Sequence, residues 1–278
     1  MALARPPKKH QPRDRAIRFS TQSTITYDTL MNTSRRRLLR ASAGWASAGF
    51  AGCQATPTGT SPFPSMLTSG DTVLFQGDSI TDSGRNREIR GASHDQAALG
   101  KGYAWLAAAS MLSKSADRRL SIHNRGVSGN KVHQLDARWD VDCIDLRPDV
   151  LSILIGVNDV WHTRNGKYDG SVELFEQGYN ALLTRTVRAL PEVRLVVCEP
   201  FVLLCGAVDE SWQPEMTAYR AAARRVADAH RAAWVPFHSM FEQASKLAPP
   251  ETWAKDGVHP TEAGSALMAQ EWLRVVDR

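Results

Sequence analysis

The sequence predicts an α/β fold in which a mainly parallel, five-stranded sheet is covered by helices on both faces. Between residues 70 and 278, short apolar runs alternate with longer amphipathic segments about five times, an order typical of parallel sheets with crossover helices. Runs such as Val150–Ile155 are rich in β-branched and apolar residues, as expected of strands buried on both faces. The Gly-x-Gly-x-x-Gly pattern of dinucleotide-binding folds does not follow the first strand, which disfavours that subclass.

The first half of this domain begins with a strand at Thr72–Phe75 and a turn at Gly77, where the missing Cβ lets the backbone bend. The charged, glycine-containing loop over 82–101 is long for such a connection, which indicates that it shapes a binding site. The next expected elements are a helix at Tyr103–Ser113, a strand at Leu120–Asn124, a helix at Val132–Cys143 and the strand at Val150–Ile155.

The second half continues the alternation. A helix with apolar residues at helical spacing is expected over Val172–Leu190, and Pro191 ends it. Thr261 is the expected cap of a final helix that reaches Val276. Between them we expect strands at Val193–Cys198 and Ala233–Pro236, and helices at Pro214–Ala233 and Phe241–Ala248.

The segment before the domain has the pattern of an export signal. Residues 1–30 are polar and irregular, which suggests a disordered or mis-assigned N-terminal extension; over 31–53, a run of arginines precedes a short apolar stretch. The paired arginines resemble a twin-arginine signal, and Phe50–Cys53 resembles a lipobox in which Cys53 would be lipidated. Residues 54–69 have the composition of a linker. We therefore expect a bacterial protein that is periplasmic, lipid-anchored or extracellular, with a disordered basic tail as the alternative.

Charge and cysteine content argue against nucleic-acid binding and against a full disulfide framework. Residues 1–53 carry ten Lys or Arg and two Asp or Glu, so the net charge of +5 becomes −3 without them. The domain therefore gives no reason to expect nucleic-acid binding. Cys143, Cys198 and Cys205 are an odd number, which disfavours a full disulfide framework, although Cys205 could pair with either of the others. No spacing indicates a metal site, and no cofactor is expected.

Candidate functional residues follow the strands or precede the last helix in four segments. Ser79 follows the first strand, Gly129 the second and Asn158 the third, while Asp256 and His259 precede the final helix. Ligands bind at the carboxyl edge of an open α/β sheet, so we expect these residues to meet there.

Together these residue types meet the needs of acyl transfer. A serine becomes a good nucleophile when a base takes its proton, and a histidine held by an aspartate is such a base. The backbone N–H groups of Ser79 and Gly129 and the amide of Asn158 would form an oxyanion hole. A turn serine, a surface histidine and a helix-capping asparagine are the non-catalytic alternatives.

Four sequence blocks resemble the SGNH (GDSL) hydrolase family: Gly77–Ile80, Asn124–Gly129, Gly156–Asp159 and Asp256–Pro260. The resemblance covers about residues 70–276 and implies a flavodoxin-like, three-layer α/β/α sandwich. It also implies the following roles: Ser79 is the nucleophile, His259 the base, Asp256 the third member of the triad, and Gly129 and Asn158 complete the oxyanion hole.

Longer stretches are similar to bacterial acetylxylan esterases of this family, notably Gly77–Arg85, Leu99–Tyr103, Ala137–Trp139 and Ile155–Trp161. This similarity implies deacetylation of xylan or xylo-oligosaccharides. The alternatives are a lysophospholipase or thioesterase of the same fold and a non-catalytic carbohydrate-binding module.

Aromatic residues near these blocks are candidates for contacting a sugar. Tyr103, Trp161 and Trp253 either line a substrate pocket or pack in the core. Arg138 is a candidate support of the site. Self-association into a homo-oligomer is left open. The histidines without a partner pattern are treated as structural or exposed: His94, His123, His133, His162, His230 and His238.

Overall fold

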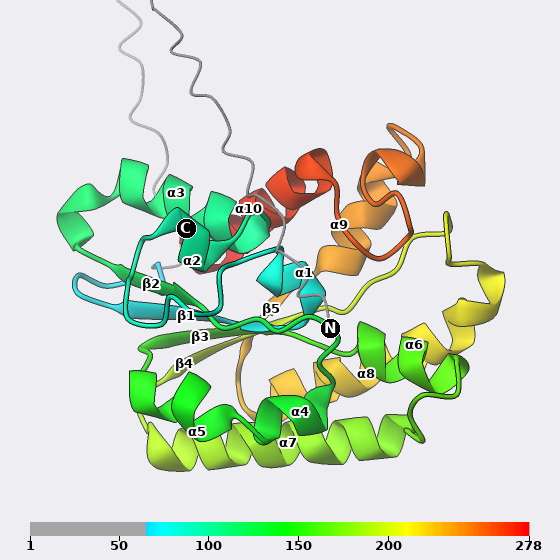
Figure 1. The fold of residues 1–278 in the computed structure, drawn as a ribbon, viewed down its shortest axis with the longest axis horizontal. Helices are drawn as coiled ribbons and strands as arrows, with labels where there is room; N and C mark the ends of the chain where they lie inside the picture. The colour runs from blue at the N-terminus through cyan, green and yellow to red at the C-terminus, as the bar shows by residue number, and fades with distance from the viewer. Residues whose placement is uncertain (1–64, 278) are drawn as a thin grey trace, which may run out of the picture. The chain divides into compact units, whose positions relative to one another are not determined.

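The computed structural model describes residues 65–277, which contain a five-stranded, fully parallel sheet in the order β2-β1-β3-β4-β5 (Figure 1). This arrangement confirms the predicted α/β class. The strands are β1 (Thr72–Gly77), β2 (Ser121–Asn124), β3 (Val150–Leu154), β4 (Arg194–Cys198) and β5 (Ala233–Val235).

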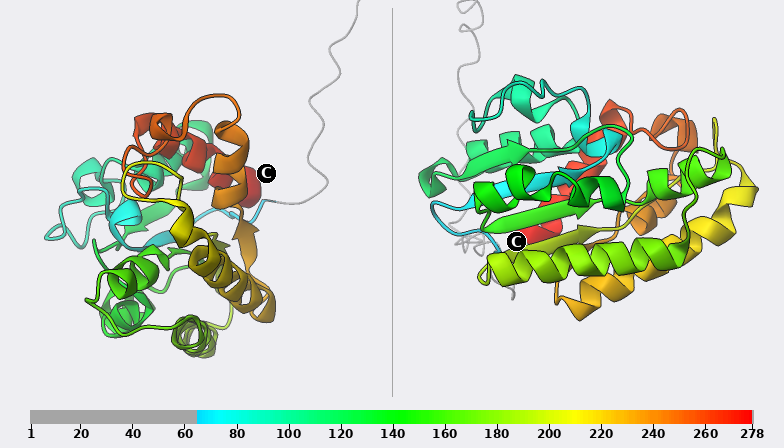
Figure 2. Two further views of the ribbon diagram at one scale, coloured as in Figure 1. Left: turned by 90° about the vertical axis from the view of Figure 1, so that its right-hand side faces the viewer. Right: turned by 60° about the horizontal axis from the view of Figure 1, so that its bottom comes forward.

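Helices cover both faces of the sheet and make a three-layer sandwich (Figures 1 and 2). On one face lie α3 (Tyr103–Lys114), α9 (Phe237–Ala244) and α10 (Glu262–Val276); on the other lie α4 (Val132–Asp136), α5 (Trp139–Asp142), α7 (Val172–Ala189) and α8 (Gln213–Ala229). Shorter helices lie in the connections: α1 (Ser79–Asp82), α2 (Gln96–Leu99), α6 (Val157–Arg164), and the 3₁₀ turns η1 (Ala116–Arg118), η2 (Ile144–Leu146), η3 (Glu210–Trp212) and η4 (Pro250–Thr252).

Large aromatic side chains fill the core between the sheet and the helices. The Phe75 ring lies 4.9 Å from the ring of Trp272 and 5.7 Å from that of Tyr103, centroid to centroid. The buried indole N–H of Trp272 donates to Ser152 Oγ at 2.9 Å. Burying an indole is favourable when its N–H keeps a partner in this way. As predicted, Thr261 caps α10 by accepting from Gly264 N at 3.1 Å.

Two helices differ from the sequence-based expectation. The helix expected over 132–143 is divided into α4 and α5, because Arg138 has non-helical angles (φ −119°, ψ 9°) and its side chain turns toward the sheet. No helix is expected from the sequence directly after β3, yet this segment forms helix α6. Its polar and β-branched residues have weak helix propensity, and tertiary packing overrides that preference.

The beginning of the folded domain also differs from the expectation. The linker was expected to reach residue 69, yet Leu67 is 4% exposed and Met66 N donates to Val276 O at 2.8 Å. The domain therefore includes residues 65–69. The extension, the export signal with Cys53 and the rest of the linker lie outside the described residues and stay predictions. Within 65–277, no helix is long and apolar enough to span a bilayer.

The strand order reverses direction at one edge of the sheet. The chain passes from β1 to β2 on one side and then to β3 on the other. The crossovers after β1 and β3 diverge, so the carboxyl ends of these two strands form the topological switch point at which open α/β sheets bind ligands. Helices α1 and α6 begin at that edge (Figure 1).

Candidate active site

Ser79 is the first residue of α1, directly outside the carboxyl end of β1. The turn before it requires glycine: at Gly77 a Cβ would lie 2.3 Å from the carbonyl oxygen of Leu154 on β3. Asp78 caps α1 by accepting from Ile80 N at 3.0 Å. A close strand-to-strand approach and a side-chain cap therefore hold the serine at the edge of the sheet.

The structure brings Ser79, His259 and Asp256 into one hydrogen-bond chain. Ser79 Oγ lies 2.8 Å from His259 Nε2, and His259 Nδ1 lies 2.6 Å from Asp256 Oδ2. In this geometry Asp256 accepts from Nδ1–H, which leaves Nε2 free to accept the serine proton. The arrangement is that of a serine nucleophile with an oriented general base.

A tight loop before α10 presents both Asp256 and His259. The second carboxylate oxygen, Asp256 Oδ1, accepts from the backbone N–H groups of Val258 at 3.0 Å and His259 at 2.7 Å. Partial burial raises the pKa of Asp256, but the hydrogen bonds from His259 and Val258 outweigh it and hold this pKa below its usual value. Asp256 therefore stays ionised beside the imidazole across the neutral range.

The loop turns at Gly257, whose φ of +83° is in the left-handed region that favours glycine. A Cβ there would also lie 2.5 Å from the carbonyl oxygen of Cys205. The carbonyl of Gly257 accepts from Leu203 N at 2.8 Å. The loop after β4 is therefore the support on which the Asp256–His259 loop rests.

Three N–H groups at the same edge meet the requirements of an oxyanion hole. Neither Ser79 N nor Gly129 N donates a hydrogen bond within residues 65–277. Asn158 lies in the first turn of α6, and its Nδ2 donates to Asn130 O at 3.3 Å. Unused donors fixed in position are what a developing oxyanion needs.

Asp82 ties the Gly129 loop to the serine's own helix. Its Oδ2 accepts from both N and Oγ of Ser128, each at 2.9 Å, and pairs with Arg87. Burial raises the pKa of Asp82, but the Arg87 and Ser128 hydrogen bonds outweigh it and the pKa lies below its usual value. The residue before Gly129 is therefore fixed by an ionised carboxylate on α1.

Close packing reinforces this link. A Cβ at Gly126 would lie 2.4 Å from Asp82 N, so only glycine fits there. The Asn124 side chain accepts from Gly126 N at 2.8 Å and donates to Thr81 O at 2.6 Å. The end of β2 and helix α1 therefore form one rigid body beneath the Ser79 and Gly129 donors.

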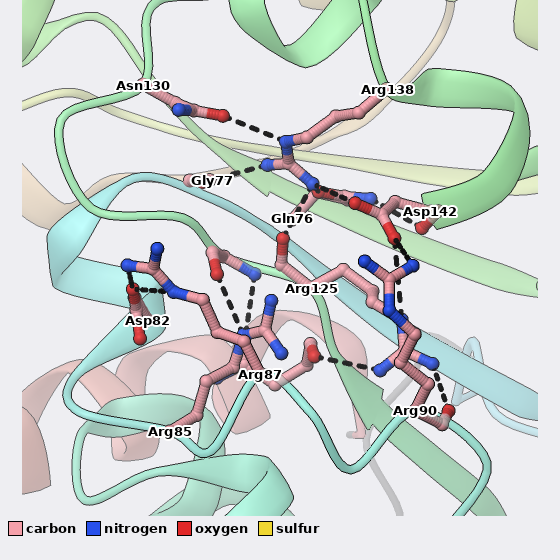
Figure 3. A network of polar contacts seen from close by, with 12 residues as sticks. Gln76, Gly77, Asp82, Arg85, Arg87, Arg90, Arg125, Asn130, Arg138 and Asp142 are labelled. Atoms are coloured by element: carbon pink, nitrogen blue, oxygen red, sulfur yellow. Dashed lines mark hydrogen bonds and ion pairs between the residues drawn. The ribbon is translucent and has the colours of Figure 1, made fainter.

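Arg138 connects this body to strand β1, and Figure 3 shows its guanidinium between Asn130 and Asp142. Its side chain is 18% exposed. It donates to Asn130 Oδ1 at 2.8 Å, Gln76 Oε1 at 3.1 Å, Arg125 O at 2.8 Å, Gly77 O at 3.4 Å and Asp142 Oδ2 at 3.0 Å. The sequence indicated a support role for Arg138, and these contacts give it a physical basis.

Two buried carboxyl groups flank Asn158. Burial raises the pKa of Asp78 to about 7, against the opposing effects of the Ile80 N–H and the His259 charge. Burial also raises the pKa of Asp159 to about 7. Each has one oxygen, Oδ2, without a hydrogen-bond partner among residues 65–277, so their environment favours the neutral acid.

The three predicted substrate-contacting aromatics lie in different surroundings. Trp161 is half-buried on α6, and its ring centroid lies 6.3 Å from that of His259 and 5.5 Å from that of Trp212. Tyr103 is only 1% exposed and lies in the core, where its hydroxyl group is hydrogen-bonded to Thr81 Oγ1 at 3.2 Å. Its prediction as a substrate contact is therefore wrong, because no substrate can reach a side chain packed under the sheet. Trp253 is half-buried and donates to Ala248 O at 3.3 Å.

Sequence reasoning missed several residues around the site. Trp212 lies beside Trp161 but belongs to none of the predicted blocks. Lys131 and His162 form a pair next to Gly129 that no motif marks. An i, i+4 spacing from Asn158 could have identified His162 only if α6 had been predicted as a helix. Within the described part of the chain, no group of His, Cys, Asp or Glu could hold a metal ion, and Cys143, Cys198 and Cys205 are free and buried.

Comparison with known proteins gives a consistent result. A sequence model described as the GDSL-like lipase/acylhydrolase family matches residues 75–267. An acetylxylan esterase of Geobacillus stearothermophilus is 32% identical over 212 residues, which cover 76% of this chain and 95% of that protein.

Solved structures agree with the sequence matches. A structure titled as a putative GDSL-like lipase from Parabacteroides merdae is 44% identical, with a TM-score of 0.75, and covers 77% of this chain and 99% of its own. The acetylxylan esterase Axe2 from Geobacillus stearothermophilus is 31% identical, with a TM-score of 0.68, over 75% of this chain and 95% of its own. Three Axe2 variants titled as catalytic mutants replace a serine, an aspartate and a histidine with alanine, the last two three positions apart.

Proposed function

This chain belongs to the GDSL-like lipase/acylhydrolase family and is a carboxylic ester hydrolase, and we propose that it removes O-acetyl groups from xylan or xylo-oligosaccharides through an acyl-Ser79 intermediate. The observation that carries this proposal is the hydrogen-bond chain from Ser79 Oγ through His259 to Asp256.

The first half-reaction forms the acyl-enzyme. Ser79 Oγ attacks the ester carbonyl carbon while its proton passes to His259 Nε2, 2.8 Å away. The carbonyl oxygen becomes an oxyanion, which accepts hydrogen bonds from the N–H groups of Ser79, Gly129 and Asn158. As the carbon–oxygen bond to the alcohol breaks, His259 gives its proton to the leaving oxygen, and Asp256 stabilises the imidazolium in between.

The second half-reaction uses water in place of the alcohol. His259 takes a proton from water, the hydroxyl adds to the acyl carbon, and collapse of the second oxyanion breaks the bond to Ser79 Oγ. The proton returns to Oγ, and a carboxylic acid leaves. No group other than the ester and water is consumed.

Two features support a sugar-derived alcohol. The ring centroids of Trp161 and Trp212 lie 5.5 Å apart. The Trp161 centroid also lies 6.3 Å from that of His259, the residue that protonates the leaving oxygen in the proposed mechanism. An aromatic ring on the leaving-group side is a suitable surface for the apolar face of a sugar. The similarity to an acetylxylan esterase over three quarters of the chain supports the same substrate class.

A longer-chain acyl hydrolase, of the lysophospholipase or thioesterase type, is the second candidate. The observation that favours it is the 44% identity to a protein titled as a putative GDSL-like lipase, which exceeds the identity to the acetylxylan esterases. The two candidates share the proposed mechanism and differ only in the acyl group and in the leaving alcohol or thiol.

One experiment tests the proposal and separates the candidates. The purified protein is incubated with acetylated xylo-oligosaccharides, and acetate is followed by NMR. We expect release by the wild type and none above background by Ser79→Ala, because alanine has no nucleophile. A Ser79→Ala rate equal to that of the wild type contradicts the serine mechanism. Nitrophenyl esters from acetyl to octanoyl are compared in parallel, and a preference for octanoyl selects the lipase-type candidate.

A further inference from the structure

His162 borders the loop that carries Gly129. Helix α6 places Asn158, Trp161 and His162 at i, i+3 and i+4, so the three side chains lie on one side of the helix. A Cβ built on Gly129 would lie 3.9 Å from His162 Cε1. The imidazole is therefore next to the proposed oxyanion hole, while Trp161 is on the His259 side of the same helix face.

Lys131 fixes the protonation of this imidazole. Its Nζ lies 3.1 Å from His162 Nδ1. An ammonium group only donates hydrogen bonds, so Nδ1 must accept. A neutral ring that accepts at Nδ1 carries its proton on Nε2, and an imidazolium could not accept at all. Partial burial and the charges of Lys131 and Lys167 also lower the pKa of His162.

The surroundings of Lys131 are unusual for a lysine. The residue is only 6% exposed, and within residues 65–277 no carboxylate lies within 4.0 Å of its ammonium group. Its Nζ lies 5.2 Å from the ring centroid of Tyr168. The Tyr168 ring in turn stacks on the His133 ring, with their centroids 5.0 Å apart. Burying a cation without a carboxylate partner is costly. Burial raises the pKa of Asp159 and the Lys131 charge opposes that rise, so this carboxyl group offsets part of the cost, while the hydrogen bond that Lys131 Nζ makes is to His162.

The opposite nitrogen of His162 is available for a ligand. His162 Nε2 has no hydrogen-bond partner among the described residues and is not a buried atom. A neutral N–H donor beside the oxyanion loop can bind an oxygen acceptor close to the ester. Hydroxyl and ring oxygens of a sugar are acceptors of this kind.

We propose that His162 donates its Nε2–H to a hydroxyl or ring oxygen of the acyl acceptor, and that Lys131 is the positioning residue that holds His162 in the donating tautomer. This inference rests on the proposed function, because it assumes an acceptor with oxygens beside the ester. It assigns a selectivity role to two residues outside the triad and the oxyanion hole.

The first test compares a sugar ester with an ester that lacks hydroxyl groups. For each variant we take the ratio of kcat/KM on an O-acetylated methyl β-xyloside to kcat/KM on 4-nitrophenyl acetate. Loss of one hydrogen bond to an uncharged group should lower this ratio about threefold to tenfold in His162→Leu. His162→Gln keeps an N–H donor and should recover part of the ratio.

His230→Leu is the matched control. His230 Nε2 is hydrogen-bonded to Asn180 Oδ1 on α7 at 2.8 Å, away from the site. The kcat/KM ratio of His230→Leu should therefore equal that of the wild type. A ratio in His162→Leu that also equals the wild-type value overturns the acceptor contact. If instead the wild type cleaves only the nitrophenyl ester, the proposed sugar substrate is wrong and the acceptor contact is overturned together with it.

The second test measures the tautomer without any substrate. In ¹⁵N-detected imidazole spectra of the whole protein at pH 7, we expect His162 to be neutral with its proton on Nε2. Lys131→Met should increase the Nδ1–H tautomer, because the enforced acceptor role is lost. An imidazolium or an Nδ1–H tautomer in the wild type overturns the positioning role of Lys131, even if the sugar ester is cleaved.

Discussion

The two halves of the proposed site are held in different ways. The half that contains Ser79 and Gly129 is supported by buried polar groups, among them Asp82 with a side chain 3% exposed and Asp142 with one 7% exposed. In the other half, the side chains of Asp256 and His259 are 41% and 46% exposed. They are fixed mainly by bonds within their own four-residue loop.

This difference fits the role proposed for each half. An oxyanion hole stabilises the transition state only when its donors are fixed before the reaction, so a rigid, buried support suits it. In the proposed mechanism His259 exchanges protons with the leaving alcohol and then with water, and this role requires access from solvent. We therefore expect substitutions of the exposed Asp256 and His259 side chains to affect rate without stability, and substitutions in the buried support to affect both.

The largest expected effect is on rate, from Asp256→Asn. The asparagine amide has one accepting oxygen where the carboxylate has two. Its NH₂ group donates to Nδ1 and so favours the imidazole tautomer that carries its proton on Nε2. Because that tautomer cannot accept the serine proton, kcat should fall about 10⁴-fold. The free energy of unfolding should change by less than about 1 kcal/mol, because the carboxylate is 41% exposed. Kinetics on 4-nitrophenyl acetate and urea unfolding measure the two quantities.

The control for this variant is Asp228→Asn, which removes an exposed carboxylate paired with Arg224 on α8. It should leave both quantities close to the wild-type values. A kcat for Asp256→Asn within tenfold of the wild-type value would contradict the assignment of Asp256 to the triad. A large loss of stability in this variant would contradict the proposed difference between the two halves.

The next effect is on stability, from Arg138→Met. Methionine keeps an apolar stem but removes the bonds to Asn130, Gln76 and Gly77 and one partner of buried Asp142. Breaking a buried ion pair of this kind should lower the free energy of unfolding by about 3 kcal/mol. Since Asn130 and Gly77 flank the oxyanion donors, kcat should fall as well, by about tenfold. Urea midpoints and initial rates are the measurements.

Arg185→Met is the matched control for Arg138→Met. Arg185 also contacts two aspartates, Asp136 and Asp140, but its side chain is 38% exposed and theirs are 55% and 75% exposed. An exposed network of this kind contributes about 1 kcal/mol or less. Equal losses of stability in the two variants would mean that burial around Arg138 has no special effect.

The same contrast explains how much of the molecule the sequence predicts. The strands and the residues at their carboxyl ends follow from short apolar runs and turn glycines, which are local signals. The amino-acid sequence alone therefore predicts that Ser79, Asn158 and His259 meet at one edge of the sheet. Their catalytic roles stay predictions until variants are measured.

The supporting residues were not predictable in this way. Asp82 and Lys131 act on groups 46 and 31 residues away in the chain, and such pairings depend on how the crossovers pack. Tyr103 was misassigned because a buried aromatic and a pocket aromatic look alike in a sequence. Helix α6 was missed because its first turn is polar and β-branched, so tertiary contacts and not propensity determine it.

The smallest expected effect concerns Asp78, the buried acid next to Ser79. Burial raises its pKa to about 7 from an ordinary value of 3.8, so between these pH values the folded state binds a proton that the unfolded state has released. Its contribution to the unfolding free energy is therefore present at low pH and is lost as pH rises toward and through 7. Asp78→Asn keeps an oxygen to accept from Ile80 N but removes the titration.

Urea unfolding at pH 5, 6, 7 and 8 should therefore show the wild type losing stability relative to Asp78→Asn, by about 2 kcal/mol in total. The matched control is Asp95→Asn, which changes an exposed helix cap of the same chemistry on α2 and should show no such trend. A difference between wild type and Asp78→Asn that stays constant with pH would mean that Asp78 is solvated in the folded protein. The buried, nucleophile-bearing half would then be more open than its packing indicates, and its contrast with the Asp256 loop would be weaker.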